Sequence, residues 1–275
     1  GVFMKNLKLL LLAFVTASIL SACSNHANVE NHEQLTLQNQ AVLGLVWTQQ
    51  SGEYQALTHQ AFNIAKTAFE HAIVAKDKKK AVVVDLDETM IDNSAYAGWQ
   101  IENGQGFSQE SWTKWVNARQ VYAIPGAVDF ANYVNTLNGT IFYVSNRLDK
   151  SERQATIDDM KRLGFPNVSD KTLLLKTDKS AKSERFNSIL NQGYDIVLYV
   201  GDNLNDFGDT TYHKSNSERR DFVTLNAKKF GTKYIVLPNP NYGDWEGGLD
   251  KNYYKGDLKN KLNIRNNAIR AWDGK

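Results

Sequence analysis

The sequence is poor in the residues that build disulfides, histidine-based sites and nucleic-acid surfaces. Its 275 residues include 1 cysteine, so no internal disulfide is expected. The 5 histidines are scattered along the chain and do not cluster, so we assign them no catalytic role. The formal net charge of +2 argues against a protein that binds nucleic acid polymers. For the dense basic run Lys76–Lys80, we favour a solvated helix end over a phosphate-attracting patch.

Long hydrophobic runs are also missing, because the apolar run Leu9–Leu20 is too short to span a membrane comfortably. Lys5 and Lys8 precede this run, and Leu20-Ser21-Ala22-Cys23 ends it. This order predicts a secretory signal peptide over residues 1–22 that ends in a lipobox, the pattern of bacterial lipoproteins. We expect a lipid on Cys23, a polar tether over 23–34, and an outer-membrane anchor that faces the periplasm or the cell surface.

Beyond the tether, the apolar pattern predicts an α/β protein. Residues 35–75 have the spacing of helices, whereas Ala81–Leu86 is a β-branched run too short for a helix. Four similar runs follow at 140–146, 172–176, 195–203 and 233–239, with helix-like segments at 126–137, 151–163, 180–191 and 217–229 between and after them. Continuous apolar strands that alternate with amphipathic helices predict a Rossmann-like, doubly wound parallel sheet with both faces covered.

The stretch 92–125 breaks this alternation. It is dense in aromatic residues and glycine and has no strand pattern, so we expect a smaller helical cap with a helix around Ser111–Arg119. We predict one folded region over 35–275. Its parts would be a core over about 76–91 and 126–240, a cap over about 35–75 and 92–125, and a C-terminal extension over 241–275.

Polar side chains stand where the predicted strands end. They are Asp85 and Asp87 at the end of the first run, Ser145 and Asn146 at the end of the second, Lys182 at the helix after the third, and Asp202, followed by Asp206, at the end of the fourth. In a doubly wound sheet, ligands bind beyond the carboxyl ends of the strands. The sequence therefore predicts four aspartates, a hydroxyl and a lysine at one edge of the sheet.

These side chains suit phosphoryl transfer. Oxygen ligands without nearby His or Cys fit a hard cation, and we expect Mg²⁺ between Asp85 and Asp202. Lys182 and the Ser145 hydroxyl suit a phosphate group. We predict that Asp85 attacks phosphorus and forms an aspartyl-phosphate, while Asp87 protonates the leaving oxygen and then deprotonates water. A spacing of two would place both carboxylates on one face of a regular strand.

The segment Asp85-Leu86-Asp87-Glu88-Thr89 resembles the DxDx[TV] first motif of the haloacid dehalogenase superfamily. Ser145, Lys182 and the Asp202/Asp206 pair match its second, third and fourth motifs, in order and on the expected elements. The second aspartate of the first motif is typical of the phosphatase branch. The chain is similar, over essentially everything after the signal peptide, to the bacterial class C nonspecific acid phosphatases and to their outer-membrane lipoprotein e type.

The resemblance implies a Mg²⁺-dependent phosphomonoesterase of broad specificity that works at acidic pH. It implies aromatic phosphates and nucleoside 5′-monophosphates as substrates, including nicotinamide mononucleotide during NAD scavenging. In this family aromatic residues sandwich the base, and Trp112 and Tyr242 occupy the matching segments. Aromatic faces stack on any base, which suits tolerance of several nucleotides. A homodimer is also implied, and histidine-type acid phosphatases are disfavoured.

The resemblance implies that the metal is bound by the carboxylates of Asp85 and Asp202 and by the backbone carbonyl of Asp87, with Asp206 supporting these ligands. It also implies that Asn146 binds the phosphate, together with Ser145 and Lys182. Several readings stay open. Lys176 or Lys179 could take the place of Lys182 as the phosphate lysine, and Arg147 could approach the phosphate or form a salt bridge within its loop. Asp206 could begin a helix, support the metal, or do both. Trp112 could pack with Trp115 in a core instead of stacking on a base. An alternative function is a surface lipoprotein that binds haem or a host component, with phosphatase activity secondary.

Overall fold

The computed structural model describes residue 29 and residues 31–275 of the chain. The predicted signal peptide and Cys23 lie outside the described residues. Residues 31–39 are helical, so the end of the segment predicted as a polar tether belongs to a helix. No helix within the described part of the chain is long and apolar enough to cross a membrane.

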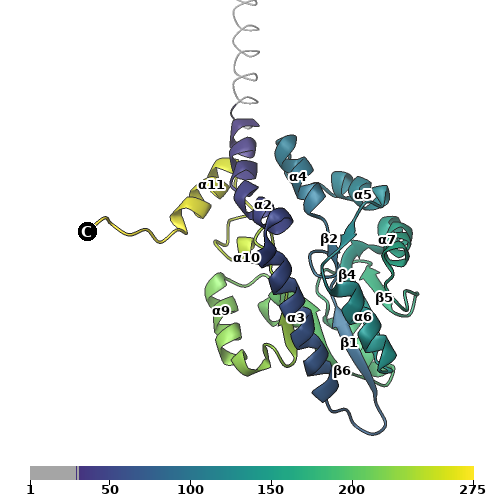
Figure 1. The fold of residues 1–275 in the computed structure, drawn as a ribbon. Coiled ribbons are helices and arrows are strands. Elements are labelled where there is room, and N and C mark those ends of the chain that lie inside the picture. The colour runs from purple at the N-terminus through teal and green to yellow at the C-terminus, as the bar shows by residue number, and fades with distance from the viewer. Residues whose placement is uncertain (1–28, 30) are drawn as a thin grey trace, which may run out of the picture.

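A five-stranded parallel sheet of order β5-β4-β1-β6-β7 forms the centre of the molecule (Figure 1). The strands are β1 (Lys79–Val84), β4 (Thr140–Leu148), β5 (Leu173–Lys176), β6 (Tyr194–Gly201) and β7 (Tyr234–Val236). Each coincides with a predicted apolar run, and the predicted Rossmann-like parallel sheet is confirmed. Because β1 pairs with β4 on one side and β6 on the other, the strand order switches at β1, and in sheets of this kind ligands bind beyond the carboxyl ends of the strands at the switch point.

Helices cover both faces of this sheet. Those of the core are α3 (Gly52–His71), α6 (Ala127–Thr136), α7 (Asp149–Leu163), α8 (Ser183–Asn191) and α9 (Asn216–Leu225). Val82 and Val84 of β1 share a hydrophobic cluster with α3, α6 and α7, whereas Ala81 and Val83 pack on the α8 side. This alternation explains why β1 is a continuous apolar run, since neither of its faces meets water.

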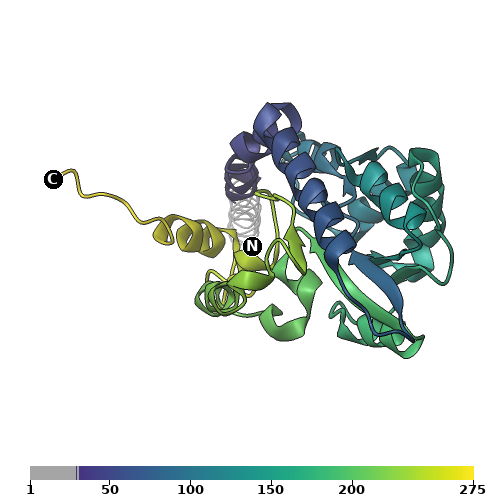
Figure 2. The same ribbon diagram turned by 60° about the horizontal axis from the view of Figure 1, so that its bottom comes forward.

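Helix α3 covers the sheet, although residues 35–75 were predicted as cap. Phe62 and Phe69 are each 1% exposed, and the Phe62 ring stacks on Phe130 of α6 with centroids 5.5 Å apart. Figures 1 and 2 show α3 lying along the strands. By its contacts α3 is therefore a core helix, and α2 (Val42–Gln50), which precedes it, packs against the cap helix α4 (Ser94–Glu102). The wider division into domains stays a prediction.

The insertion at 92–125 holds two helices and a short strand pair. Helix α5 (Gln109–Ala118) is the helix predicted around Ser111–Arg119, and it begins two residues earlier because Ser108 caps it by accepting from the Ser111 amide. Helix α4 and the antiparallel pair β2 (Ile91–Asp92) with β3 (Tyr122–Ala123) were not predicted. Strands of two residues carry no periodic signal.

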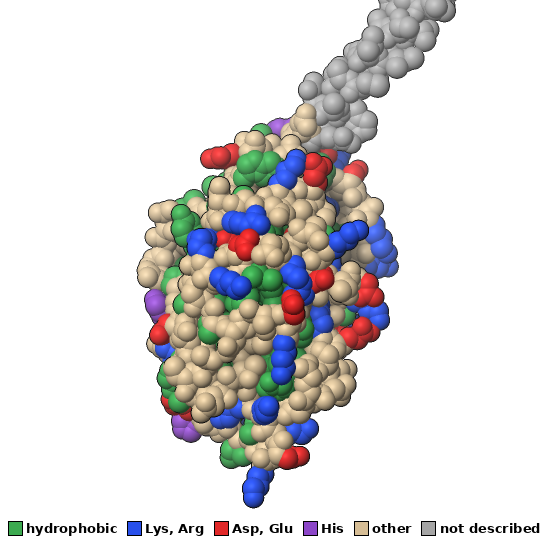
Figure 3. Space-filling model, turned by 90° about the vertical axis from the view of Figure 1, so that its right-hand side faces the viewer, with side chains coloured by type: hydrophobic (Ala, Val, Ile, Leu, Met, Phe, Trp, Pro, Cys, Tyr) green, Lys and Arg blue, Asp and Glu red, His purple; other side chains and the backbone are tan. Residues whose placement is uncertain are grey.

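The remaining elements follow β6 and β7. They are η1 (Leu204–Phe207), η2 (Asp209–Thr211), η3 (Ala227–Lys229), α10 (Asp244–Gly247) and α11 (Leu258–Asn267). On the face drawn in Figure 3, Lys and Arg side chains are interspersed with Asp and Glu. That the chain binds no nucleic acid polymer stays a prediction.

Candidate active site

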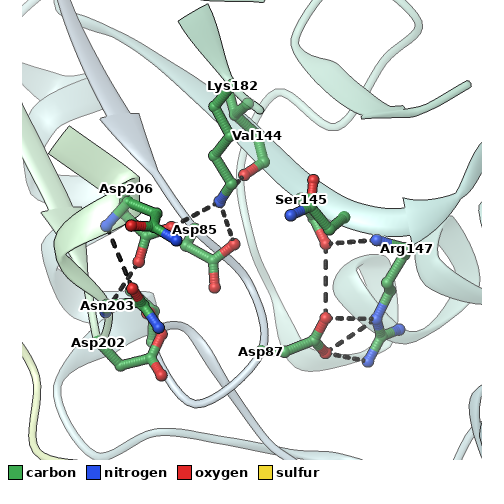
Figure 4. A network of polar contacts seen from close by, with 12 residues as sticks. Asp85, Asp87, Val144, Ser145, Arg147, Lys182, Asp202, Asn203 and Asp206 are labelled. Atoms are coloured by element: carbon green, nitrogen blue, oxygen red, sulfur yellow. Dashed lines mark hydrogen bonds and ion pairs between the residues drawn. The ribbon is translucent and has the colours of Figure 1, made fainter. Parts of the chain in front are cut away.

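Asp85 and Asp87 stand where β1 ends and the chain turns. The Asp85 amide still pairs with the Val200 carbonyl at 2.9 Å, but Glu88 has a φ of 59°, in the left-handed region. The Leu86 carbonyl accepts from the amides of Met90 and Ile91 at 2.8 and 2.9 Å. The regular strand assumed for the spacing of two is therefore absent, and the two carboxylates reach different cationic partners (Figure 4).

Lys182 is the partner of Asp85. Its Nζ lies 2.5 Å from Asp85 Oδ1 and 2.8 Å from Asp206 Oδ1, and it donates to the Val144 carbonyl at 2.7 Å. The lysine is 4% exposed and stands immediately before α8, as predicted. The structure thus brings together the segments that follow β1, β5 and β6 and, through Val144, the middle of β4.

The rival lysines lie elsewhere. Lys176 is the last residue of β5, and Lys179 pairs with the exposed Glu184 at 2.5 Å. Lys182 is therefore the lysine that reaches the aspartates.

Three carboxylates converge beside Lys182. Asp85, Asp202 and Asp206 each offer an oxygen within 4.8 Å of the others. Burial raises the pKa of Asp85 to about 7, Lys182 opposes this rise, and the charges of Asp206 and Asp87 add to it. Burial and the charges of Asp206 and Asp85 raise the pKa of Asp202 well above its usual range. Three carboxylates against one ammonium leave an excess of negative charge, which fits a hard divalent cation with oxygen ligands.

Asp206 contributes both to the turn at η1 and to the carboxylate cluster beside Lys182. Its Oδ2 accepts from the Asn203 amide at 2.9 Å, which completes a capping box at η1, while its Oδ1 accepts from Lys182. Gly201 makes this possible, because a Cβ on that residue would lie 2.2 Å from Asp206 Oδ2. Both readings that the sequence left open for Asp206, the cap and the support of the site, therefore have contacts in the structure.

Asp87 is held by Arg147 and Asn93. Arg147 Nη2 lies 2.8 Å from Asp87 Oδ1, and Asn93 Nδ2 donates to the same oxygen at 2.9 Å. Arg147 thus forms a salt bridge with Asp87 of the first motif, not one confined to its own loop. Sequence reasoning missed Asn93, because its partners Trp115 and Arg147 are 22 and 54 positions away in the sequence.

Ser145 and Asn146 differ in their surroundings. The Ser145 hydroxyl is buried, accepts from the Arg147 amide at 3.1 Å and lies 3.4 Å from Asp87 Oδ2. The Asn146 amide oxygen accepts from Arg185 Nη2 at 2.7 Å, in an exposed contact. Ser145 therefore lies within the site, next to Asp87, whereas Asn146 lies at the exposed margin of the site.

Trp112 and Tyr242 belong to the cap and to the C-terminal loop. Trp112 packs edge-on to Tyr96 at 5.2 Å, and its ring lies 5.8 Å from the Arg147 guanidinium carbon. Tyr242 is 43% exposed, and its hydroxyl donates to the buried carboxylate of Glu88. Trp112 therefore packs on Tyr96 and borders Arg147, the partner of Asp87, while its packing with Trp115 stays a prediction. The contact of Glu88 with Tyr242 was not predicted, since the two are far apart in sequence.

Residues 10–245 match the family HAD superfamily, subfamily IIIB (Acid phosphatase). Among curated proteins, the chain is 28% identical over 170 residues to the stem 31 kDa glycoprotein of Glycine max, with 58% of each chain covered. It is 26% identical over 172 residues to acid phosphatase 1 of Solanum lycopersicum, with 60% of each covered. The chain thus spans 58–60% of the length of these curated relatives.

Solved structures extend the likeness. The class C acid phosphatase of Bacillus anthracis superposes with a TM-score of 0.81 at 36% identity, over 86% of this chain and 99% of that one. A second structure of the class C acid phosphatase of Bacillus anthracis, with tungstate bound, gives the same TM-score at 35% identity over the same shares. The family match spans more than half of the chain, and the fold and the order of the motif residues agree with it. The chain therefore belongs to the haloacid dehalogenase (HAD) superfamily, subfamily IIIB, the acid phosphatases.

Proposed function

We propose that the chain is a Mg²⁺-dependent phosphomonoesterase that works through an aspartyl-phosphate on Asp85. The observation that carries the proposal is the convergence of Asp85, Asp202 and Asp206 around the buried Lys182, at the carboxyl end of the central strand. The fold itself does not require three desolvated carboxylates at this position, and burying charge without a partner is costly. A site for a cation and a phosphate group explains the cost.

Asp85 and Asp202, with the backbone carbonyl of Asp87, would hold the metal, and Asp206 would support them. When bound, Mg²⁺ would neutralise charge on the transferring phosphoryl group and orient it. The donor set is suitable, because carboxylate and carbonyl oxygens are the ligands of hard cations. Lys182 would supply a further positive charge beside the phosphate oxygens, and the Ser145 hydroxyl and Asn146 further hydrogen bonds.

The chemistry would follow in two displacements. A carboxylate oxygen of Asp85 attacks phosphorus, the bond to the leaving oxygen breaks, and Asp87 protonates that oxygen. Water then attacks the phosphorylated Asp85, Asp87 takes the water proton, and phosphate departs. Because Asp87 must carry a proton when the leaving group departs, we propose an acidic optimum. Activity on a nucleotide that rises steadily above neutral pH would contradict it.

For substrates we propose aromatic phosphates and nucleoside 5′-monophosphates, including nicotinamide mononucleotide. The Trp112 ring lies beside Arg147, and the Tyr242 hydroxyl contacts Glu88. Aromatic faces at these positions could stack on a base without reading its edge. The tungstate complex of the relative from Bacillus anthracis supports binding of a tetrahedral oxyanion, the shape of phosphate, at a site of this family.

For location we propose that a lipid on Cys23 anchors the chain in the outer membrane, facing the periplasm or the cell surface. We also propose that the protein is a homodimer. The order of signal features around Cys23 supports the anchor. Membrane fractionation of the wild type and of Cys23→Ala tests it: the variant should move from the membrane to the soluble fraction. A variant that stays in the membrane would contradict the anchor. Size-exclusion chromatography with light scattering tests the dimer.

A turnover screen tests the function. Phosphate release is measured on p-nitrophenyl phosphate, nucleoside 5′-monophosphates and nicotinamide mononucleotide, with Mg²⁺ and with EDTA. We expect turnover with Mg²⁺ and its loss in EDTA, restored by added metal. No activity on any phosphomonoester would overturn the proposal.

A further inference from the structure

The two oxygens of Asp87 have unequal surroundings. Oδ1 accepts hydrogen bonds from Arg147 Nε and from Asn93 Nδ2, both at 2.9 Å, and it also lies 2.8 Å from Arg147 Nη2 in an ion pair. Oδ2 has longer contacts, 3.3 Å to Arg147 Nε and 3.4 Å to Ser145 Oγ. Two short hydrogen bonds occupy the two lone pairs of Oδ1, so Oδ2 keeps the capacity to carry a proton.

The amide of Asn93 can face Asp87 in one orientation. Its Oδ1 accepts from Trp115 Nε1 at 2.8 Å and from Arg147 Nη2 at 3.2 Å. Indole and guanidinium nitrogens only donate, so a flipped amide would place two donors against donors. Asn93 is 3% exposed, and although it stands at the N-cap position of α4, its side chain makes no capping bond. The residue is turned away from the helix and into the site.

Arg147 is equally fixed. It is 1% exposed, and its Nη1 donates to Thr156 Oγ1 of α7 at 3.2 Å. Its Nη2 donates to the Asn93 amide oxygen at 3.2 Å. Contacts to α7 and to Asn93 therefore hold the guanidinium plane that pairs with Asp87 in one orientation.

We propose that Asn93 and Arg147 are positioning residues that saturate Oδ1 of Asp87 and so make Oδ2 the oxygen that gives and takes the proton. This inference rests on the proposed function and deepens it. In the first displacement, the proton on Oδ2 passes to the leaving oxygen, which keeps the electron pair of the broken P–O bond. In the second, the attacking water gives a proton to Oδ2 as the bond between phosphorus and Asp85 breaks.

A positioning role predicts a dependence on the leaving group. p-Nitrophenolate departs without a proton, whereas the alkoxide of an alkyl phosphate such as glycerol 3-phosphate needs one. The ratio kcat/KM reports the steps up to that departure. In Asn93→Ala, we expect kcat/KM on glycerol 3-phosphate to fall roughly 10²-fold, and the fall on p-nitrophenyl phosphate to be about tenfold smaller. A purely structural loss would lower both alike.

Two further variants keep the test decisive. Tyr143→Phe removes one buried hydrogen bond, from the Tyr143 hydroxyl to the Pro166 carbonyl at 2.9 Å, away from Asp87, and should leave the substrate ratio unchanged. Should Asn93→Ala not fold, Arg147→Lys keeps the buried charge but loses the planar fork, and we expect the same bias against glycerol 3-phosphate.

Equal losses on both esters, or no loss, in the folded variants would overturn the positioning role. A wild type that hydrolyses neither ester would instead refute the proposed function itself.

Discussion

At the scale of single residues, the close contact between Gly201 and Asp206 fixes the position of one carboxylate of the site. Gly201 ends β6 directly against the Asp206 side chain, and a Cβ there would lie 2.2 Å from Oδ2 and 2.3 Å from Cβ of that aspartate. Neither backbone nor carboxylate can yield without breaking the η1 capping box or the contact to Lys182.

We therefore predict that Gly201→Ala displaces Asp206 and lowers kcat/KM on a nucleotide by about 10-fold or more, since small misplacements at a reacting centre are costly. The Mg²⁺ concentration for half activity should rise as well. Gly193→Ala is the comparison: its Cβ would meet nothing within 4 Å, although its φ of +84° adds local strain. A Gly201→Ala enzyme with unchanged metal dependence would contradict the role of this contact.

The sequence predicted the strand-end aspartates and Lys182, because motif spacing and strand boundaries are local features. It could not predict how they pair. The contacts of Arg147 to Asp87, of Asn93 to Arg147 and of Glu88 to Tyr242 join residues 60, 54 and 154 positions apart. Such partners are chosen by the fold, and the turn at Glu88, which sends Asp87 to Arg147, has no periodic signal.

At the scale of elements, helix α3 shows what periodicity leaves undecided. Its apolar spacing predicted a helix correctly, but spacing does not say which surface the helix covers. The buried Phe62 meets Phe130 of α6, whereas Leu57 on the same helix is 41% exposed. The helix therefore stabilises the core and, through it, the position of β1 beneath the site.

We predict that Phe62→Ala lowers the free energy of unfolding by about 3–5 kcal/mol, because it removes a fully buried aromatic ring and leaves a cavity. Leu57→Ala, a matched truncation on the exposed side, should cost no more than about 1 kcal/mol. Urea unfolding followed by circular dichroism measures both. Similar losses in the two variants would mean that α3 does not belong to the core.

At the scale of the whole molecule, the carboxylate cluster links stability, pH and metal. In the metal-free protein the folded-state pKa of Asp85 is about 7, above its ordinary 3.8, so folding favours the protonated form. The stability from this proton is fully present below about pH 4 and is lost as pH rises through 7. Mg²⁺ needs the ionised form, so its binding strengthens over the same interval.

We therefore predict that the melting temperature in EDTA falls between about pH 4 and 7, and that the increase given by Mg²⁺ grows over that range. Differential scanning calorimetry measures both. The Asp85→Asn protein, which cannot titrate at this position, should show a flatter dependence. A Mg²⁺ effect that is the same at each pH would argue against metal binding at this cluster.

The central claim is that Asp85 attacks phosphorus. Its most direct measurement is the rate of phosphate release from a nucleoside 5′-monophosphate, with Mg²⁺, by the wild type and by Asp85→Asn. The substitution keeps the shape of the side chain and removes the nucleophile, so we predict a folded variant whose turnover falls by roughly 10³-fold or more. A folded Asp85→Asn protein that releases phosphate at a rate comparable to the wild type would contradict the account.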